Sequence, residues 1–212
     1  MNNQSPKIES CRAALVANGF EVFVAADPAQ AKQIFFEQIF PPLKDGLISW
    51  GDSMTMEATG LLDALLADPQ LNLLKTFDPT AERGEIMERR RQALLADLFL
   101  TGSNAVTLDG KLVNLDMIGN RTAAIAFGPK KVVLFIGRNK IVPDLVAAFD
   151  RVRNVAAPKN AKRHNMPTPC ASTGRCHDCS SPQRICNAWT ILDKCFPKER
   201  IKVVLIDDDL GL

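Results

Sequence analysis

The sequence predicts an α/β fold of three layers, in which helices cover both faces of a mostly parallel sheet. Short apolar runs bounded by turn residues alternate with longer segments of helical periodicity along most of the chain. The clearest run, KVVLFI at residues 131–136, has no polar alternation, which is typical of a parallel strand buried on both faces. Strands separated by helices favour a parallel sheet with right-handed crossovers.

Each expected element has its own local signals. Asn18-Gly19 ends a helix, Asp27-Pro28 begins one with an N-cap residue followed by proline, and Pro41-Pro42 stops it. Asp109-Gly110, between two apolar runs, predicts a hairpin turn. The expected strands are residues 20–25, 46–50, 71–77, 98–101, 131–136 and 201–206, and the expected helices are residues 8–16, 27–40, 55–66, 81–96 and 143–153.

Composition limits the class of protein. A length of 212 residues suits a single domain, taken here as residues 1–212 with a cysteine-rich segment at 165–196. The formal charge of +2 does not favour nucleic acid or an anionic membrane as the partner. No apolar stretch approaches a membrane span, and the first ten residues contain no apolar signal region. We therefore expect a cytoplasmic protein.

Cysteines are concentrated near the end of the sequence. Five of the six lie between residues 170 and 195, while Cys11 stands alone. In a reducing compartment such a cluster is more typical of metal binding than of disulfides. The Cys176-x-x-Cys179 pair directs two thiolates at one metal, and Gly174 permits a tight turn before it.

The fourth ligand is chosen by helical geometry. If a helix begins at Ser181-Pro182 and continues to Cys195, Cys186 and Cys195 lie about 180° apart and do not reach the same metal. Cys195 is then a buried apolar thiol. Four thiolates fit either a 4Fe-4S cluster or structural zinc, and the single Cys-x-x-Cys pair favours the iron–sulfur cluster. The predicted ligands are Cys170, Cys176, Cys179 and Cys186.

Two loops have the composition of a site for a small anionic ligand. Each follows a strand, so both are expected at the carboxyl edge of the sheet, where ligands bind in open α/β folds. The first loop, residues 51–55, begins a helix whose free N–H groups favour an anion. The second, residues 101–104 together with 114–121, contains Arg121, which offers a two-pronged contact. The alternative is that these residues are ordinary helix caps and turn formers. The predicted ligand-binding residues are Gly51, Asp52, Ser53, Met54, Thr55, Gly102, Ser103, Asn104, Asn114, Asp116, Gly119 and Arg121.

Three segments carry a family resemblance that covers nearly the whole chain. They are residues 98–142, the loop WGDSMTMEATGL and the tail TPCASTGRCHDCSSPQRIC. Together they resemble the lactate-utilisation (LUD) domain family, including its lactate utilisation protein C-like members. The resemblance implies the NagB/RpiA/CoA transferase-like superfamily, with the fold of ribose-5-phosphate isomerase, glucosamine-6-phosphate deaminase and the CoA transferases. It also implies a role near lactate oxidation, beside iron–sulfur or flavin subunits.

Two classes of function remain open from the sequence. The first is an iron–sulfur accessory or electron-transfer component of lactate or organic-acid oxidation that binds a small anion. The second is an enzyme resembling the sugar-phosphate isomerases or CoA transferases, or a regulatory binder, with structural zinc. The similar isomerases place an acid where this chain has Asn104, and an amide cannot act as a general base. Glu57 and Asp116 remain as candidate acids.

Overall fold

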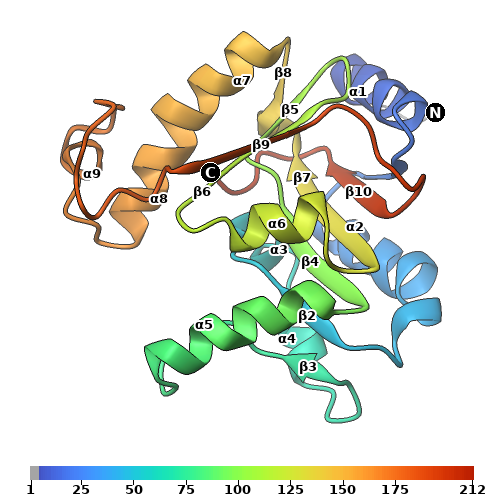
Figure 1. Ribbon diagram of the computed structural model, residues 1–212. Coiled ribbons are helices and arrows are strands. Elements are labelled where there is room, and N and C mark those ends of the chain that lie inside the picture. Colours follow the sequence, from blue (N-terminus) through green and yellow to red (C-terminus); the bar gives the residue numbers. More distant parts are fainter. Residues whose placement is uncertain (1–4) are drawn as a thin grey trace.

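The computed structural model describes residues 5–212 and contains a central parallel sheet (Figure 1). The neighbouring strands all pair in parallel, as predicted, and β7 and β4 lie at its centre. Every residue of β7 after Lys131 is buried, which accounts for its uninterrupted apolar sequence. The order across the sheet is β1 (Glu21–Ala25), β10 (Ile201–Ile206), β7 (Lys131–Gly137), β4 (Leu98–Gly102), β2 (Ile48–Trp50) and β3 (Leu73–Leu74).

Helices and a second sheet cover the two faces of the central sheet. Alternate residues of β7 point to opposite sides, with Leu134 in one apolar core and Phe135 in the other. Helices α1 and α6 contribute to the first core, and α2, α3 and α4 to the second. The three-layer prediction is therefore confirmed. The helices are α1 (Pro6–Ala17), α2 (Pro28–Ile34), α3 (Met54–Glu57), α4 (Leu61–Leu66), α5 (Arg83–Gln92), α6 (Asn120–Ala126), α7 (Leu145–Arg151), α8 (Ala157–Arg163) and α9 (Pro169–Thr173).

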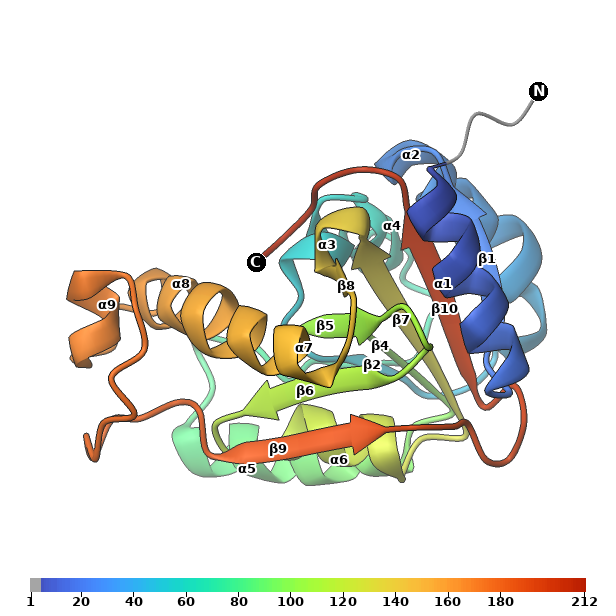
Figure 2. The same cartoon turned by 90° about the horizontal axis from the view of Figure 1, so that it is seen from above.

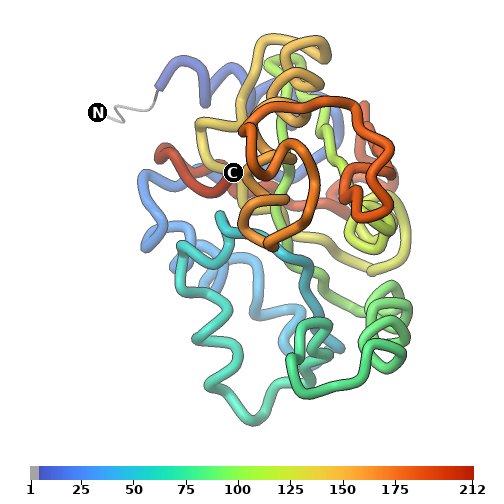
Figure 3. Tube along the Cα trace, turned by 90° about the vertical axis from the view of Figure 1, so that its left-hand side faces the viewer, coloured from blue at the N-terminus to red at the C-terminus, as the bar shows by residue number. Residues whose placement is uncertain are grey.

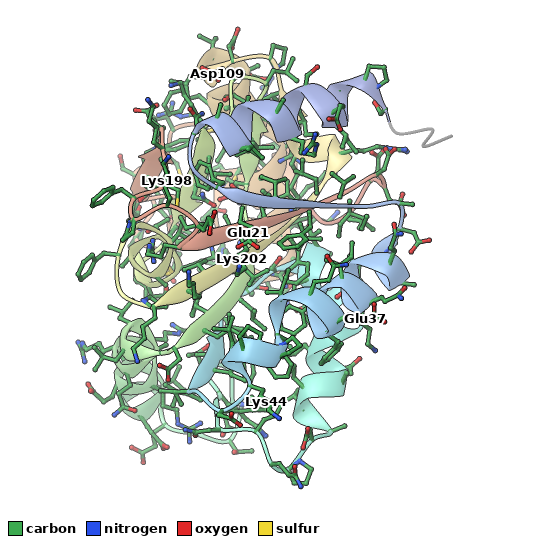
Figure 4. All side chains as sticks on the ribbon, turned by 90° about the vertical axis from the view of Figure 1, so that its right-hand side faces the viewer. Glu21, Glu37, Lys44, Asp109, Lys198 and Lys202 are labelled. Carbon is green, nitrogen blue, oxygen red and sulfur yellow. The ribbon has the colours of Figure 1, made fainter. Side chains whose placement is uncertain are left out.

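At one edge of the central sheet, β1 lies beside β10. Glu21 and Lys202 are register partners on these strands and form an ion pair across them (Figure 4). Asp27 caps α2 by accepting a hydrogen bond from Gln30 N (2.8 Å), as the Asp-Pro signal predicts. Across residues 5–212, no helix has both the length and the apolar character needed to cross a bilayer.

The second sheet is mixed and lies beside the first (Figure 2). Its order is β8 (Ile141–Val142), β5 (Ala105–Thr107), β6 (Leu112–Asp116) and β9 (Ala188–Leu192). The predicted hairpin is confirmed, because β5 and β6 pair antiparallel across Asp109-Gly110, with Gly110 at φ +81°. Asn18 Nδ2 donates to Asp109 O (2.9 Å), which ties the hairpin tip to the end of α1.

The predicted helix from Ser181 to Cys195 is wrong. This stretch contains β9, which pairs antiparallel with β6 along all five of its residues. Trp189, Thr190 and Ile191 favour a pleated strand, and the free edge of β6 supplies backbone partners that a sequence pattern does not reveal. The helical argument that separated Cys186 from Cys195 therefore fails. Strand β9 still separates them, because its five residues of extended chain span about 17 Å.

Residues 156–169, which are rich in proline, asparagine, lysine and arginine, have the composition of a solvated linker before the cysteine segment, but this prediction is wrong over their first half. Helix α7 continues through a π-helical turn, Val152–Ala156, directly into α8. Pro158 lies in the first turn of α8, where the wide π turn accommodates a residue that has no N–H to donate. Two other elements also differ from their predicted bounds. The helix expected at 55–66 is divided at Gly60, which adopts φ +64°, and only Leu73–Leu74 of the strand expected at 71–77 pairs with β2.

Candidate functional site

The carboxyl ends of four central strands border one cavity of about 620 Å³. Loops after β2, β4, β7 and β10 each contribute to its lining, which matches the expected position of a ligand site in an open α/β sheet. Figure 3 views this side of the molecule, with the cysteine segment in orange and α5 in green. Eight of the twelve predicted ligand-binding residues line the cavity: Asp52, Ser53, Met54, Gly102, Ser103, Asn104, Asp116 and Arg121.

The two predicted loops meet at this edge. A Cβ atom placed on Gly102 would lie 2.6 Å from Ser53 Oγ, and one placed on Gly51 would lie 3.1 Å from Arg121 Cγ. The two loops therefore approach each other closely: a side chain at Gly102 would displace Ser53, and one at Gly51 would need a shift of a few tenths of an ångström in Arg121. The remaining predicted residues, Gly51, Thr55, Asn114 and Gly119, lie outside the cavity lining.

Arg121 organises the second loop. Its Nε donates to Asp116 Oδ1 (3.0 Å), Nη1 to Asn114 Oδ1 (2.7 Å) and Gly102 O (3.0 Å), and Nη2 to Asn104 Oδ1 (2.8 Å) and Leu115 O (3.3 Å). All five N–H groups of the guanidinium thus have protein acceptors. In this arrangement Arg121 holds the cavity floor together and has no donor free for the two-pronged ligand contact that the sequence suggested.

The predicted hydroxyl groups are also engaged within the protein. Ser53 Oγ accepts from Met56 N (3.3 Å) as the cap of α3, and Ser103 Oγ donates to Ala105 O (2.9 Å). Thr55 is fully buried, and its Oγ1 donates to Leu210 O (3.1 Å). The capping and turn-forming roles of these residues are therefore present, and a ligand needs other donors.

Lys140 is a cationic residue of the cavity that the sequence did not reveal. It follows β7 in a 3-10 turn, lines the cavity and is 5% exposed. Its Nζ donates to Thr55 Oγ1 (2.7 Å), and within residues 5–212 it forms no ion pair. Burial lowers its pKa from 10.5 to about 7, and the charges of Arg151 and Arg121 act in the same direction. The sequence feature that could have identified Lys140 is its position shortly after the clearest buried strand.

Other charged groups lie around the cavity mouth. Arg163, at the end of α8, forms an ion pair with Asp52, and His164 Nε2 lies 3.1 Å from Asp52 Oδ2. These contacts join the residues expected to be a linker to the first predicted loop. Arg83 and Arg90 of α5 also line the cavity. Neither arginine was predicted as a site residue, because a run of charges on a helix usually faces solvent.

The carboxylates do not form a free acid–base pair in the cavity. Asp116 is held by Arg121 (2.8 Å) and by Thr122 N (2.9 Å), and Asp52 is paired with Arg163. Burial and the charge of Asp52 raise the pKa of Glu57, but this side chain is exposed and does not line the cavity.

The four predicted metal ligands lie in one segment at the far end of α8, and each is partly buried. Gly174 ends α9 at φ +75°, which is the tight turn expected between Cys170 and the Cys-x-x-Cys pair. Arg184 connects the two sides of the segment, because its Nη1 donates to Cys179 O (2.7 Å) and its Nε to Cys186 O (3.0 Å).

The four cysteine thiols are suitable metal ligands by their chemical type, but their positions do not form a metal site. Burial raises the pKa of Cys186, Arg184 opposes this, and the neighbouring thiols of Cys176 and Cys179 add to the rise, so these sulfurs interact electrostatically. Asp178 N donates a hydrogen bond to Cys176 Sγ (3.4 Å). However, no group of three or more His, Cys, Asp or Glu side chains in the described part of the chain is arranged to hold a metal ion. The predicted metal-binding segment is therefore not confirmed.

The other two cysteines belong to the protein core. Cys195 is 5% exposed, as predicted, and Cys11 is fully buried. Burial raises the pKa of Cys11 to about 12, which makes its thiol inert at neutral pH.

A parallel sheet between covering layers, with a cavity over the carboxyl ends of its strands, defines an open three-layer α/β protein. The chain belongs to the LUD domain family, whose model matches residues 8–206. Its fold is similar to that of a DUF162 family protein from Deinococcus radiodurans, with a TM-score of 0.54, 14% sequence identity and coverage of 94% of this chain and 95% of that one. None of the curated proteins matches the chain significantly.

Proposed function

We propose that this LUD protein is an iron–sulfur accessory or electron-transfer component of lactate or related organic-acid oxidation, and that it binds an anionic ligand beside its cluster. One observation carries the proposal: the cavity that contains Lys140 also extends to the cysteine segment. Met166 and Ile185 line it, and Ile185 immediately precedes Cys186. A ligand held by Lys140 and a cluster held by the cysteines would thus be neighbours.

The electrostatics of the cavity support an anion. The two acidic side chains in its lining are paired with Arg121 and Arg163, whereas Lys140 has no acidic side chain as a partner among the described residues. A buried lysine whose pKa is lowered is stabilised in its charged form when an anion binds next to it.

The four cysteines would supply the ligands of a 4Fe-4S cluster, which carries one electron at a time. Oxidation of lactate to pyruvate releases two electrons and two protons, so we propose that the chain relays electrons to iron–sulfur or flavin subunits of a cytoplasmic lactate-oxidising system. The alternative isomerase-like chemistry has less support, because no acidic side chain of residues 5–212 is unpaired in the cavity and Asn104 Oδ1 accepts hydrogen bonds from Arg121 and Leu115 N.

The test is metal analysis of protein purified without oxygen. We expect iron and acid-labile sulfide in nearly equal amounts, with broad absorption near 400 nm that bleaches on reduction, on the order of four iron atoms per chain. Cys176→Ser should lose most of the iron, while Cys11→Ala, which removes a buried thiol of the core, should keep it. A colourless protein with one zinc per chain would instead support a structural metal and a binding or isomerase-like role.

A further inference from the structure

The cavity has an apolar half that a small organic acid does not explain. Four of the six methionines of the chain line it, together with several other apolar side chains. Some of these are unusually exposed for large apolar groups: Phe77 by 43%, Met117 by 42% and Ile118 by 46%. Methionine suits a surface that adapts to an apolar ligand, because its side chain is flexible and polarisable. The methionines are Met54, Met87, Met117 and Met166.

Helix α5 supplies one wall through a single face. Arg83, Ile86, Met87 and Arg90 line the cavity, at the spacing that places residues on one side of a helix. No residue of α5 is fully buried, so this face is directed to the cavity and not to a core. The Arg90 guanidinium lies over the Phe77 ring, 5.6 Å from its centre, and its Nε has no hydrogen-bond partner within residues 5–212.

The size of the cavity also favours a ligand larger than a small organic acid. Cavities of about 300–1,000 Å³ hold drug-sized ligands, and this one measures about 620 Å³. A three-carbon acid bound to Lys140 would leave most of the methionine-lined wall in contact with water.

We propose that the cavity is a two-part site for an amphipathic anion larger than lactate: Lys140 binds its carboxylate or phosphate, and the wall of Met54, Met87, Met117 and Met166 binds an extended apolar body. Arg83 and Arg90 border the apolar wall and add positive potential. The proposal rests on the anion site of the proposed function and specifies the class of ligand that this site takes.

The test is calorimetric binding of straight-chain carboxylates from acetate to decanoate, with lactate included. We expect the affinity to rise roughly two- to fourfold with each added methylene until the cavity is filled. Lys140→Met should weaken every member by a similar factor, roughly tenfold, and leave the dependence on chain length unchanged. The double variant Met87→Gln, Met117→Gln should flatten that dependence, with the largest loss of affinity for decanoate. Both side chains are partly exposed, so the fold should tolerate the changes.

Val146→Gln serves as a control, because this apolar side chain is 79% exposed on α7 and does not line the cavity. Acetate and lactate that bind through Lys140, with no gain for longer chains, would overturn the two-part site and leave the anion site intact. A chain-length dependence that the double variant does not alter would also overturn it, since the apolar contact would then lie elsewhere. If no carboxylate binds, both the anion site and the two-part site are wrong.

Discussion

Replacement of Lys140 by methionine tests the reasoning about the cavity through protein stability. The charged form of this lysine is disfavoured in the folded protein, since burial lowers its pKa from 10.5 to about 7. The unfolded chain therefore binds more protons than the folded one between these values, and stability rises with pH across that window. Below pH 7 the full cost of the buried charge is present, and above 10.5 it is absent.

The magnitude follows from the same two values. At about 1.4 kcal/mol per pH unit, the gap corresponds to a cost of about 4–5 kcal/mol at pH 6–7, falling to about 2 kcal/mol at pH 9. Methionine has a similar length without the charge but loses the hydrogen bond to Thr55, which is worth about 1 kcal/mol. Lys140→Met should thus raise the free energy of unfolding by about 3 kcal/mol at pH 6–7, and by about 1 kcal/mol at pH 9.

The assay is urea denaturation of both proteins from pH 6 to pH 10. Lys44→Met provides a control, since Lys44 is exposed (Figure 4), does not line the cavity and should give no pH-dependent difference. A Lys140→Met variant that is less stable than the parent at pH 6, or a difference that stays constant over this range, would refute the assignment of a desolvated lysine.

Three further predictions concern the neighbouring groups. Arg121→Met should lower the free energy of unfolding by about 3–5 kcal/mol in thermal or chemical denaturation, because it removes the cation of a buried ion pair and leaves the charge of Asp116 uncompensated; a change below 1 kcal/mol would contradict the central role of Arg121. Gly102→Ala should cost about 1–3 kcal/mol through its clash with Ser53, and a neutral effect would show that the loops are not in contact. In metal-free, reduced protein a thiol reagent should modify the four cysteines of residues 170–186 rapidly at pH 8 and Cys11 only on unfolding, and rapid modification of Cys11 would contradict its burial.

The sequence predicted the architecture where local and global signals agree. The run at β7, the capped start of α2 and the turn at Asp109-Gly110 each specify their element almost alone. β9 was missed because its strand state depends on the free edge of β6, a contact between residues about 75 positions apart. The helical path through Pro158 was missed because a proline after a π turn has the same sequence signal as one that ends a helix.

The candidate site was predicted in position but not in its chemistry. Strand ends located both loops, because carboxyl ends of parallel strands share one edge. The roles of individual groups required the structure. Arg121 has the composition of a ligand-binding residue but all its donors are engaged, whereas Lys140 gains its importance from burial without an acidic partner. No sequence pattern reports desolvation at a single position.

The central claim, that an anion site lies beside a cysteine-bound iron–sulfur cluster, is tested most directly by electron paramagnetic resonance of the reduced protein during a titration with decanoate. We predict the spectrum of a reduced 4Fe-4S cluster that shifts on addition of the carboxylate in the parent protein, and a much weaker shift in Lys140→Met at the same concentration. A protein without a paramagnetic cluster, or a cluster whose spectrum does not change while calorimetry shows the carboxylate to be bound, would contradict the claim.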